Sequence, residues 1–417
     1  MKRESFGSRL GFILVSAGCA IGIGNVWKFP YICGAYGGAA FILIYLCFLV
    51  ILGIPVLVAE FAVGRGSHTS VAKCFDKLAP AGSCWKPLKF IGIIGCYMLM
   101  MFYTTVGGWM IYYCVKSLRG DFVGATPEAV TQSFSDMLGN APTMMLWMVI
   151  ICLIGFAVCF MGLQNGIEKI SKVMMSALLI IMVILAVHSV MMEGAGEGIR
   201  FYLIPDFQKI KEAGVGNVVF AALSQSFFTL SIGIGAMLIF GSYLDKSRSL
   251  TGEAVSITVL DTFVALTAGF IIIPACFSYG IQPDAGPSLI FITLPNIFAK
   301  MSGGALWGSL FFLFLTFAAV STIIAVFENL IVFNMELFGW NRKKSVVVCA
   351  VLVVVLSIPC VLGFNVLSGF QHLEMEAISW IWKTLLFLTI FFLLEALVTF
   401  CFAPERTDGD GTISLQR

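Results

Sequence analysis

The sequence predicts an all-α polytopic membrane protein. Of its 417 residues, 59% are hydrophobic and only 12% are charged, whereas soluble domains average about 45–50% apolar and about 25% charged residues. Apolar runs recur along the chain between short polar breaks, and a membrane-spanning helix needs about 20 apolar residues. A soluble fold could not bury so much apolar surface, so soluble, disordered and nucleic-acid-binding proteins are excluded. The net charge of +2 gives no sign of a polyanionic partner.

Ten apolar runs are predicted to cross the bilayer as helices. They cover residues 10–30, 38–63, 88–118, 144–161, 168–192, 217–243, 253–280, 305–335, 345–363 and 377–402. If the amino terminus is cytoplasmic, the inner segments hold fifteen Lys and Arg residues and the outer segments hold six. The positive-inside rule therefore places the amino terminus in the cytoplasm, and ten crossings return the carboxyl terminus to the same side.

Cysteine and histidine give no sign of a metal site. Most of the 13 cysteines lie within apolar runs, where they behave as small hydrophobic side chains. The three histidines are scattered, and no Cys/His spacing is typical of metal binding. No His/Asp/Ser constellation suggests an intramembrane enzyme. The first run lacks a signal-peptide cleavage site, so we expect no cleaved leader. We expect a protein that is not an enzyme.

Two of the predicted spans contain too many glycines for continuous helices. The first holds Gly18, Gly22 and Gly24, and Gly-Ile-Gly occurs near the middle of both the first and the sixth span, at residues 22–24 and 233–235. These spans open two five-helix halves, and glycine-interrupted segments at matching places in two halves indicate a transport site at the bilayer midplane. Unwound backbone persists there only where it lines a cavity. Packing of small residues, as in the Gly18–Gly22 pair, is the alternative.

The first span carries a specific resemblance. Residues 18–31 read GCAIGIGNVWKFPY, and further matches are GGAAF at 37–41, GIP at 53–55, FFTLS at 227–231 and FAAVST at 317–322. From about residue 3 to 371 the chain resembles the neurotransmitter:sodium symporter family, in its bacterial amino-acid branch. The resemblance implies a five-plus-five inverted repeat with discontinuous helices 1 and 6, within one transporter domain over 1–417. Repeat one would cover about 10–192 and repeat two about 217–402, in the plasma membrane of a bacterium.

The same resemblance implies two sodium sites. The first would use Ala20, Asn25, Thr229 and Asp261, completed by the carboxylate of the substrate. The second would use the carbonyls of Gly18, Ile21 and Ala318 and the hydroxyls of Ser321 and Thr322. All are hard oxygen donors, as a hard cation requires. For the two hydroxyls, the alternative is a hydrogen bond to their own helix.

Asp261 is an acid in the middle of a span, which marks a functional site by default. Many members of the family have Asn here and require chloride nearby. A carboxylate beside the cation supplies that negative charge itself, so we expect transport that does not require chloride. A protonated acid bonded to a neighbouring helix is the alternative.

The resemblance also implies a substrate site for an amino acid. Amine transporters of the family carry Asp at the position of Gly22, whereas glycine leaves room for an α-carboxylate. The residues implied around the substrate are Cys19, Ala20, Gly22, Ile23, Gly24, Leu99, Tyr103, Phe228, Ser231, Ile234, Thr322 and Val326. Because the walls are nearly all apolar and uncharged, we expect a neutral amino acid, hydrophobic or aromatic.

Five further residues match gating or structural positions. Glu60 is expected to accept hydrogen bonds from amides released in span six, since an unpaired buried carboxylate is costly. Arg3, Tyr243 and Glu336 match an inner gate, for which exposed boundary charges are the alternative. Lys28 stands at the outer gate where the family usually has Arg. It cannot form the bidentate pair that Arg forms, and its ammonium could instead reach for the membrane surface.

After residue 371 the resemblance stops, so 373–417 departs from the family pattern. The expected tenth helix, with its Asp partner for Lys28, is replaced by HLEME onward. If the codons for this segment are read in the frame that starts two nucleotides later, they can encode the family motif. We therefore hypothesise a frameshift near codon 372. The sequence therefore predicts a sodium-coupled symporter that imports a neutral amino acid by alternating access. Two alternatives stay open: an inactive or regulatory remnant of such a transporter, and a non-transporting sensor or channel on the same scaffold.

Overall fold

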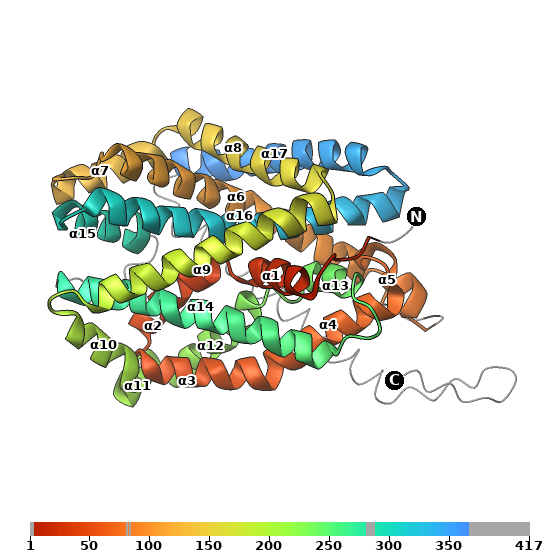
Figure 1. The fold of residues 1–417 in the computed structure, drawn as a ribbon, viewed down its shortest axis with the longest axis horizontal. Helices are drawn as coiled ribbons and strands as arrows, with labels where there is room; N and C mark the ends of the chain where they lie inside the picture. Colours follow the sequence, from red (N-terminus) through yellow and green to blue (C-terminus); the bar gives the residue numbers. More distant parts are fainter. Residues whose placement is uncertain (1–3, 81, 83–84, 281–287, 367–417) are drawn as a thin grey trace, which may run out of the picture.

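The computed structural model describes residues 4–80, 82, 85–280 and 288–366. Over these residues the chain is helical, without a strand (Figure 1). Seven of the described helical segments are long and apolar enough to cross a membrane. Four of them are α6 (Leu88–Arg119), α8 (Ala141–Phe160), α9 (Lys169–Val190) with the short segment before it, and α14 (Leu250–Ser278). The others are α16 (Gly304–Phe338), α17 (Arg342–Val366) and the α3–α4 segment.

Short π-helical segments interrupt several spans without ending them. In the second span, α3 (Ala39–Phe48) continues through η2 (Leu49–Gly53) into α4 (Ile54–Ser67). Similarly, η3 (Leu163–Glu168) leads into α9. π-Helical segments are frequent at functional sites. Glu168 is the last residue of η3, and its carboxylate accepts a hydrogen bond from the Gly7 amide in the amino-terminal segment.

The first span is broken. α1 (Arg9–Ala20) ends just before the first Gly-Ile-Gly tripeptide, at residues 22–24. The chain resumes in η1 (Gly24–Lys28) and α2 (Phe29–Ala35), which are bent by 55° relative to α1. Ser8 caps α1 by accepting a hydrogen bond from the Gly11 amide. Taken together, the two halves of this bent pair are long and apolar enough to count as an eighth crossing.

The sixth span is broken as well. α12 (Val215–Thr229) and α13 (Ala236–Gly241) are separated by residues 230–235, and each alone is too short to cross. Both interruptions fall at the Gly-Ile-Gly tripeptides, as the sequence predicts. The seven long segments and the two broken ones, together called the nine described spans, follow nine of the predicted runs. The tenth predicted run, 377–402, lies outside the described residues.

Short helices connect the spans. They are α5 (Val71–Leu78), α7 (Pro127–Leu138), α10 (Ala195–Leu203), α11 (Phe207–Ala213), η4 (Leu289–Thr293) and α15 (Leu294–Lys300). Polar side chains cap several of these helices at their amino termini: Ser70 caps α5, Thr126 caps α7 and Asp206 caps α11.

The broken helices lie at the middle of the bundle. α1 contacts α13, α14, α9 and α16, and Figure 1 shows α1 beside α13 with long helices around them. α16 packs along α6, while α13 packs on α4 and α12 on α3. The described part of the chain thus surrounds two interrupted helices with continuous ones, as the predicted fold with discontinuous helices 1 and 6 requires.

Candidate functional site

The break in the first span fits only glycine at its centre. Ile21 leaves the helical conformation with φ −72° and ψ 93°. A Cβ on Gly22 would overlap the Tyr103 hydroxyl and lie 2.6 Å from Oγ1 of Thr322. The Ile23 amide, which has no helical partner, donates a hydrogen bond of 2.9 Å to the Tyr103 hydroxyl. Side chains from α6 and α16 therefore pack directly against the non-helical backbone of this break.

The break in the sixth span depends on positive φ angles. Ser231, Gly233 and Gly235 have φ angles of 51°, 91° and 80°, and the value at Ser231 is unusual for a residue with a Cβ. The Gly233 amide donates to Oε1 of Glu60 on α4, as expected from the sequence. The hydroxyl of Ser231 donates to the Cys19 carbonyl at 2.9 Å and so joins the two breaks.

A first cluster of oxygen atoms lies between η1, α12 and α14. Asn25 donates through Nδ2 to Oδ1 of Asp261 at 2.8 Å, and Thr229 donates to Oδ2 at 2.8 Å. All three side chains are fully buried, and the Asn25 Oδ1 atom has no hydrogen-bond partner. A buried acceptor without a donor is costly. A cation would remove that cost, so this orphaned oxygen and the adjacent carboxylate fit a small hard cation.

A second cluster lies between α1 and α16. Oγ1 of Thr322 is 3.2, 3.3, 3.4 and 3.3 Å from the carbonyl oxygens of Gly18, Cys19, Ile21 and Ala318. One hydroxyl has one proton, so it cannot satisfy four acceptors. The bond from Thr322 to its own helix at Ala318 is among them, so back-bonding is present too. The excess of converging oxygens suits a small hard cation in the same way.

Ser321 adds to the second cluster. Its hydroxyl donates to Ala318 O at 2.9 Å and lies 3.5 Å from Ile21 O. The structure therefore brings together all five residues that the resemblance assigned to the second sodium site and three of the four assigned to the first. Ala20, assigned to the first, ends α1 and is 4% exposed; the carbonyls of a final helical turn lack partners within the helix.

The residues expected around the substrate surround both breaks. Leu99 and Tyr103 come from α6, Thr322 and Val326 from α16, and Ile234 from the second break. All five are at most 8% exposed, and Cys19 and Val326 are fully buried. Gly24 leaves room for the Phe228 ring, which a Cβ there would overlap, and its carbonyl accepts from Gln225 at 3.1 Å. Most of these residues are therefore buried, whereas Phe228 and Ser231 are partly exposed at the edge of the region, which we call the enclosed region.

Lys28 closes the region on one side. Its ammonium nitrogen lies 4.2 Å from the centroid of the Phe228 ring, in cation–π geometry. In the family the usual partner at this position is an Asp on the tenth helix; the residues that replace that segment here, Glu376 among them, lie outside the described residues. Lysine thus contacts an aromatic wall of the enclosed region directly.

At the opposite end, the predicted inner-gate residues have partners that the sequence analysis missed. The Tyr243 hydroxyl donates to Oε1 of Glu328 at 3.1 Å. Glu336 accepts from the amide and hydroxyl of Ser70 at 2.8 and 2.7 Å. Arg3, the third predicted member, lies outside the described residues.

Glu328 forms the most buried ion pair of the described residues. It is fully buried on α16 and accepts two hydrogen bonds from the Arg342 guanidinium, at 2.8 and 2.9 Å. Such a bidentate pair is among the stronger polar contacts. Glu328 is an acidic residue within an apolar run. The same pattern singled out Asp261, so it could also have identified Glu328 as a candidate functional residue.

The residues just before α1 are held in place by hydrogen bonds to Glu168. Glu168 accepts from the Gly7 amide at 2.7 Å, the Ser8 hydroxyl at 2.9 Å and Lys172 at 2.6 Å. Arg9 pairs with Glu253 on α14 at 2.8 Å. These contacts join the amino-terminal segment and the start of α1 to η3 and α14.

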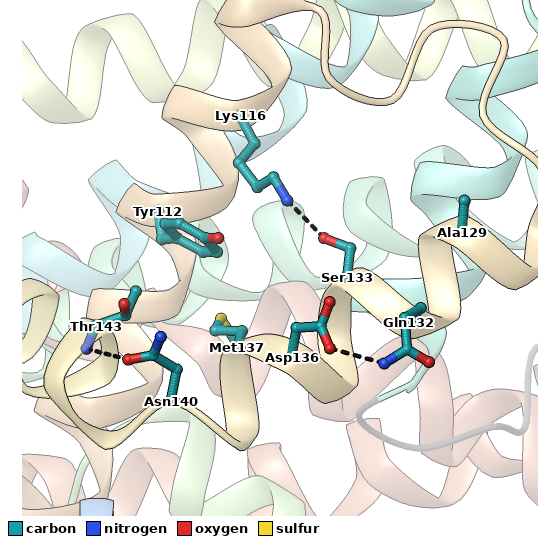
Figure 2. Close-up of a pocket in the computed structure, with 9 residues that line it drawn as sticks. All are labelled: Tyr112, Lys116, Ala129, Gln132, Ser133, Asp136, Met137, Asn140 and Thr143. Atoms are coloured by element: carbon teal, nitrogen blue, oxygen red, sulfur yellow. Dashed lines mark hydrogen bonds between the residues drawn. The ribbon is translucent and has the colours of Figure 1, made fainter.

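A separate open cavity of about 380 Å³ lies at the ends of α6, α7 and α8. Figure 2 shows its polar side chains paired with one another: Lys116 donates to Ser133 at 2.6 Å, and Gln132 donates to Asp136 at 2.7 Å. The Asn140 side chain is occupied in capping α8. This cavity contains none of the oxygen clusters or freed backbone groups, so it is not the candidate site.

The chain is similar in sequence to several known proteins. The sequence profile described as "Sodium:neurotransmitter symporter family" matches residues 3–132 and 127–401. An uncharacterized sodium-dependent transporter of Bacillus subtilis, YhdH, is 35% identical over 367 residues, covering 88% of this chain and 80% of the relative. An uncharacterized sodium-dependent transporter of Haemophilus influenzae is 33% identical, with 87% and 81% covered.

Among solved structures, the crystal structure of MhsT in complex with L-phenylalanine is similar, with a TM-score of 0.81 and 37% identity. The likeness covers 88% of this chain and 82% of MhsT. The profile match runs on to residue 401, past residue 371, where the resemblance was expected to end. Residues 373–417 lie outside the described part of the chain, so the departure and the frameshift hypothesis stay predictions.

Proposed function

The chain belongs to the sodium:neurotransmitter symporter family, a family of membrane transporters and not of enzymes, and we propose that it imports a neutral amino acid together with sodium. One observation carries the proposal: two interrupted helices place freed amides, freed carbonyls and two clusters of buried oxygens within one enclosed region. Freed backbone dipoles at mid-membrane are suited to a zwitterion and to alkali cations.

The amino acid would lie across the two breaks. Its carboxylate would meet the amides of Ile23 and Gly24 and the Tyr103 hydroxyl, and its ammonium the carbonyls of Ala20 and Phe228 and the Ser231 hydroxyl. The absence of a Cβ at Gly22 supports this orientation, because an Asp there would fill the carboxylate position. The apolar walls favour a hydrophobic or aromatic side chain. MhsT, a relative, is crystallised with L-phenylalanine, which is consistent with this class.

Sodium would occupy both oxygen clusters. A tenfold sodium gradient contributes about 1.4 kcal/mol for each ion, and a membrane potential of 100 mV adds about 2.3 kcal/mol for each charge. Two ions therefore supply about 7 kcal/mol, which is enough for concentrative uptake. Asp261 places a full negative charge in the first cluster, so chloride would not be required.

Alternating access would proceed by opening one closure at a time. The Lys28–Phe228 contact would open toward the outside, and the fastenings of the amino-terminal segment toward the cytoplasm. Both termini would be cytoplasmic in the plasma membrane of a bacterium, since the basic residues gather on that side. An inactive remnant and a non-transporting sensor or channel are the competing functions. A channel needs a continuous polar pore, whereas the two clusters of buried oxygens here lie beside the two breaks.

The test is uptake of radiolabelled neutral amino acids into proteoliposomes that contain the purified full chain. An inward sodium gradient should drive accumulation of at least one hydrophobic or aromatic amino acid, and potassium in place of sodium should abolish it. Equal uptake with both cations would contradict sodium coupling. Sodium-dependent binding without accumulation would favour the sensor.

A further inference from the structure

The carbonyl of Ile234 is a buried backbone acceptor in the middle of the sixth-span break. It lies between Gly233 and Gly235, both of which have positive φ angles, and therefore outside any regular helical ladder. Ile234 itself is 7% exposed. A buried carbonyl needs a hydrogen-bond donor, and at this position the donors come from side chains of two other helices.

Asn329 and Cys96 hold this carbonyl from two neighbouring helices. Nδ2 of Asn329 on α16 donates to Ile234 O at 3.2 Å, and Sγ of Cys96 on α6 lies 3.2 Å from the same oxygen. Asn329 also lies 3.4 Å from the Cys96 sulfur, which links the two donors. Both side chains are fully buried. The carbonyl thus receives donors from both helices at once.

Two glycines allow the neighbouring helices to pack closely against the sixth-span break. Gly92 lies one turn before Cys96, and a Cβ there would be 3.6 Å from Ile234 O, so α6 passes close to the break. On the other side, a Cβ at Gly235 would overlap the Val71 side chain of α5. The break has little room to move toward α5 or α6 while Asn329 stays in place.

The helix faces that hold the carbonyl also line the enclosed region. Leu99 follows Cys96 by three residues on α6, and Val326 precedes Asn329 by three residues on α16. Residues three apart share a helix face. The apolar walls from α6 and α16 are therefore fixed relative to Ile234, the wall that the break supplies.

We propose that Asn329, with Cys96, is a positioning residue that sets the size of amino-acid side chain accepted by the site. By holding the carbonyl, the pair prevents Ile234 from retreating when a bulky side chain presses on it. The inference rests on the proposed function, because it assumes that Ile234 contacts an amino-acid substrate.

The experiment measures binding rather than transport. Purified full chain is loaded with radiolabelled phenylalanine in saturating sodium, and alanine, leucine or tryptophan displaces it. Asn329→Leu, which keeps the approximate size but removes the donor, should shift the ratio of half-displacing concentrations for alanine and tryptophan at least fivefold in favour of tryptophan. A change of that size corresponds to the loss of about one buried hydrogen bond.

The thiol offers a matched pair. Cys96→Ser retains a donor and should keep the ratio of the unmodified chain, whereas Cys96→Ala should shift it in the same direction as Asn329→Leu, by about two- to fivefold. This comparison also decides the question if Asn329→Leu cannot be purified in a folded form. Equal ratios for the serine and alanine variants would contradict a role for the thiol donor.

Asn334→Leu is the control on the same helix. Asn334 also donates to a cysteine, Cys349, at 3.0 Å, but its hydrogen bonds do not reach the break. Its ratio should match that of the unmodified chain. An unchanged ratio in Asn329→Leu, or an equal shift in Asn334→Leu, would overturn the inference while leaving the proposed function intact. Failure of the unmodified chain to bind any neutral amino acid in sodium would instead contradict the proposed function itself.

Discussion

The ammonium of Lys28 lies 4.2 Å from the centroid of the Phe228 ring. The two residues are 200 positions apart and come from the two broken spans. Both side chains are partly exposed, so the contact forms at the edge of the enclosed region. It joins Lys28 of η1 to an aromatic ring that is proposed to line the substrate site. The proposed function therefore predicts that this contact affects how fast a bound substrate leaves.

Removal of this cation should speed substrate release. Lys28→Met retains the length of the side chain but removes the charge, and cation–π contacts at exposed sites contribute about 0.5–1 kcal/mol. We expect dissociation of a bound amino acid to become about two- to fivefold faster, measured by dilution of radiolabelled substrate from the purified protein. Lys209→Met is the control, because Lys209 lies 4.7 Å from the Phe201 ring, away from both breaks. Equal dissociation rates for Lys28→Met and the unmodified chain would refute the assignment.

Gly22 should tolerate no side chain. Gly22→Ala places a methyl group against Tyr103 and Thr322, and Gly22→Asp adds a carboxylate where the substrate carboxylate would lie. Both substitutions should abolish amino-acid binding. Gly95→Ala is the matched control, since a Cβ at that glycine of α6 meets nothing within 4 Å; this change should preserve binding. Retained uptake by Gly22→Asp would reverse the proposed substrate orientation.

Asp261 should decide the chloride requirement. The unmodified chain should transport equally well when gluconate replaces chloride, because the carboxylate supplies the negative charge beside the first cation cluster. Asp261→Asn keeps the shape and the hydrogen bond from Thr229 but removes that charge. We expect the variant to have a lower sodium affinity and to be stimulated by chloride. Collapse of uptake in gluconate by the unmodified chain would disprove the assignment.

The Glu328–Arg342 pair should stabilise the fold. Breaking a buried ion pair leaves an uncompensated charge, so Glu328→Gln should lower the apparent melting temperature in detergent. Adding Arg342→Gln should restore part of the loss, with a coupling of about 0.5–3 kcal/mol between the two sites. Lys89→Gln, which breaks the more exposed Lys89–Asp76 pair, should have little effect. Additive effects of the two substitutions at Glu328 and Arg342 would contradict coupling.

The sequence was informative wherever a feature was local. Apolar runs located the nine described spans, and the glycines at 22–24 and 233–235 located both breaks, because glycine content reports directly on helix continuity. The Glu60 contact was foreseeable, since a buried acid beside a broken helix needs donors. The ends of helices were less well defined; α16, for example, continues to Phe338, beyond the predicted limit at residue 335.

Contacts between distant segments could not be found in this way. Glu328 receives its hydrogen bonds from Tyr243 and Arg342, and Asn329 reaches Ile234 across 95 positions. No periodicity relates such residues, because their proximity depends on how α13, α16 and α17 pack. Glu336 illustrates the same limit: its hydrogen bonds to Ser70 on the chain before α5 follow from tertiary packing alone.

The most direct test of sodium coupling is equilibrium binding of a radiolabelled neutral amino acid to the purified full chain as sodium replaces potassium at constant ionic strength. Binding should rise steeply with sodium concentration, and Thr322→Val, which removes one hydroxyl from the second cluster while nearly preserving its volume, should shift the rise to at least tenfold higher sodium. Equal binding in potassium and sodium, or a Thr322→Val curve that overlies that of the unmodified chain, would contradict the account.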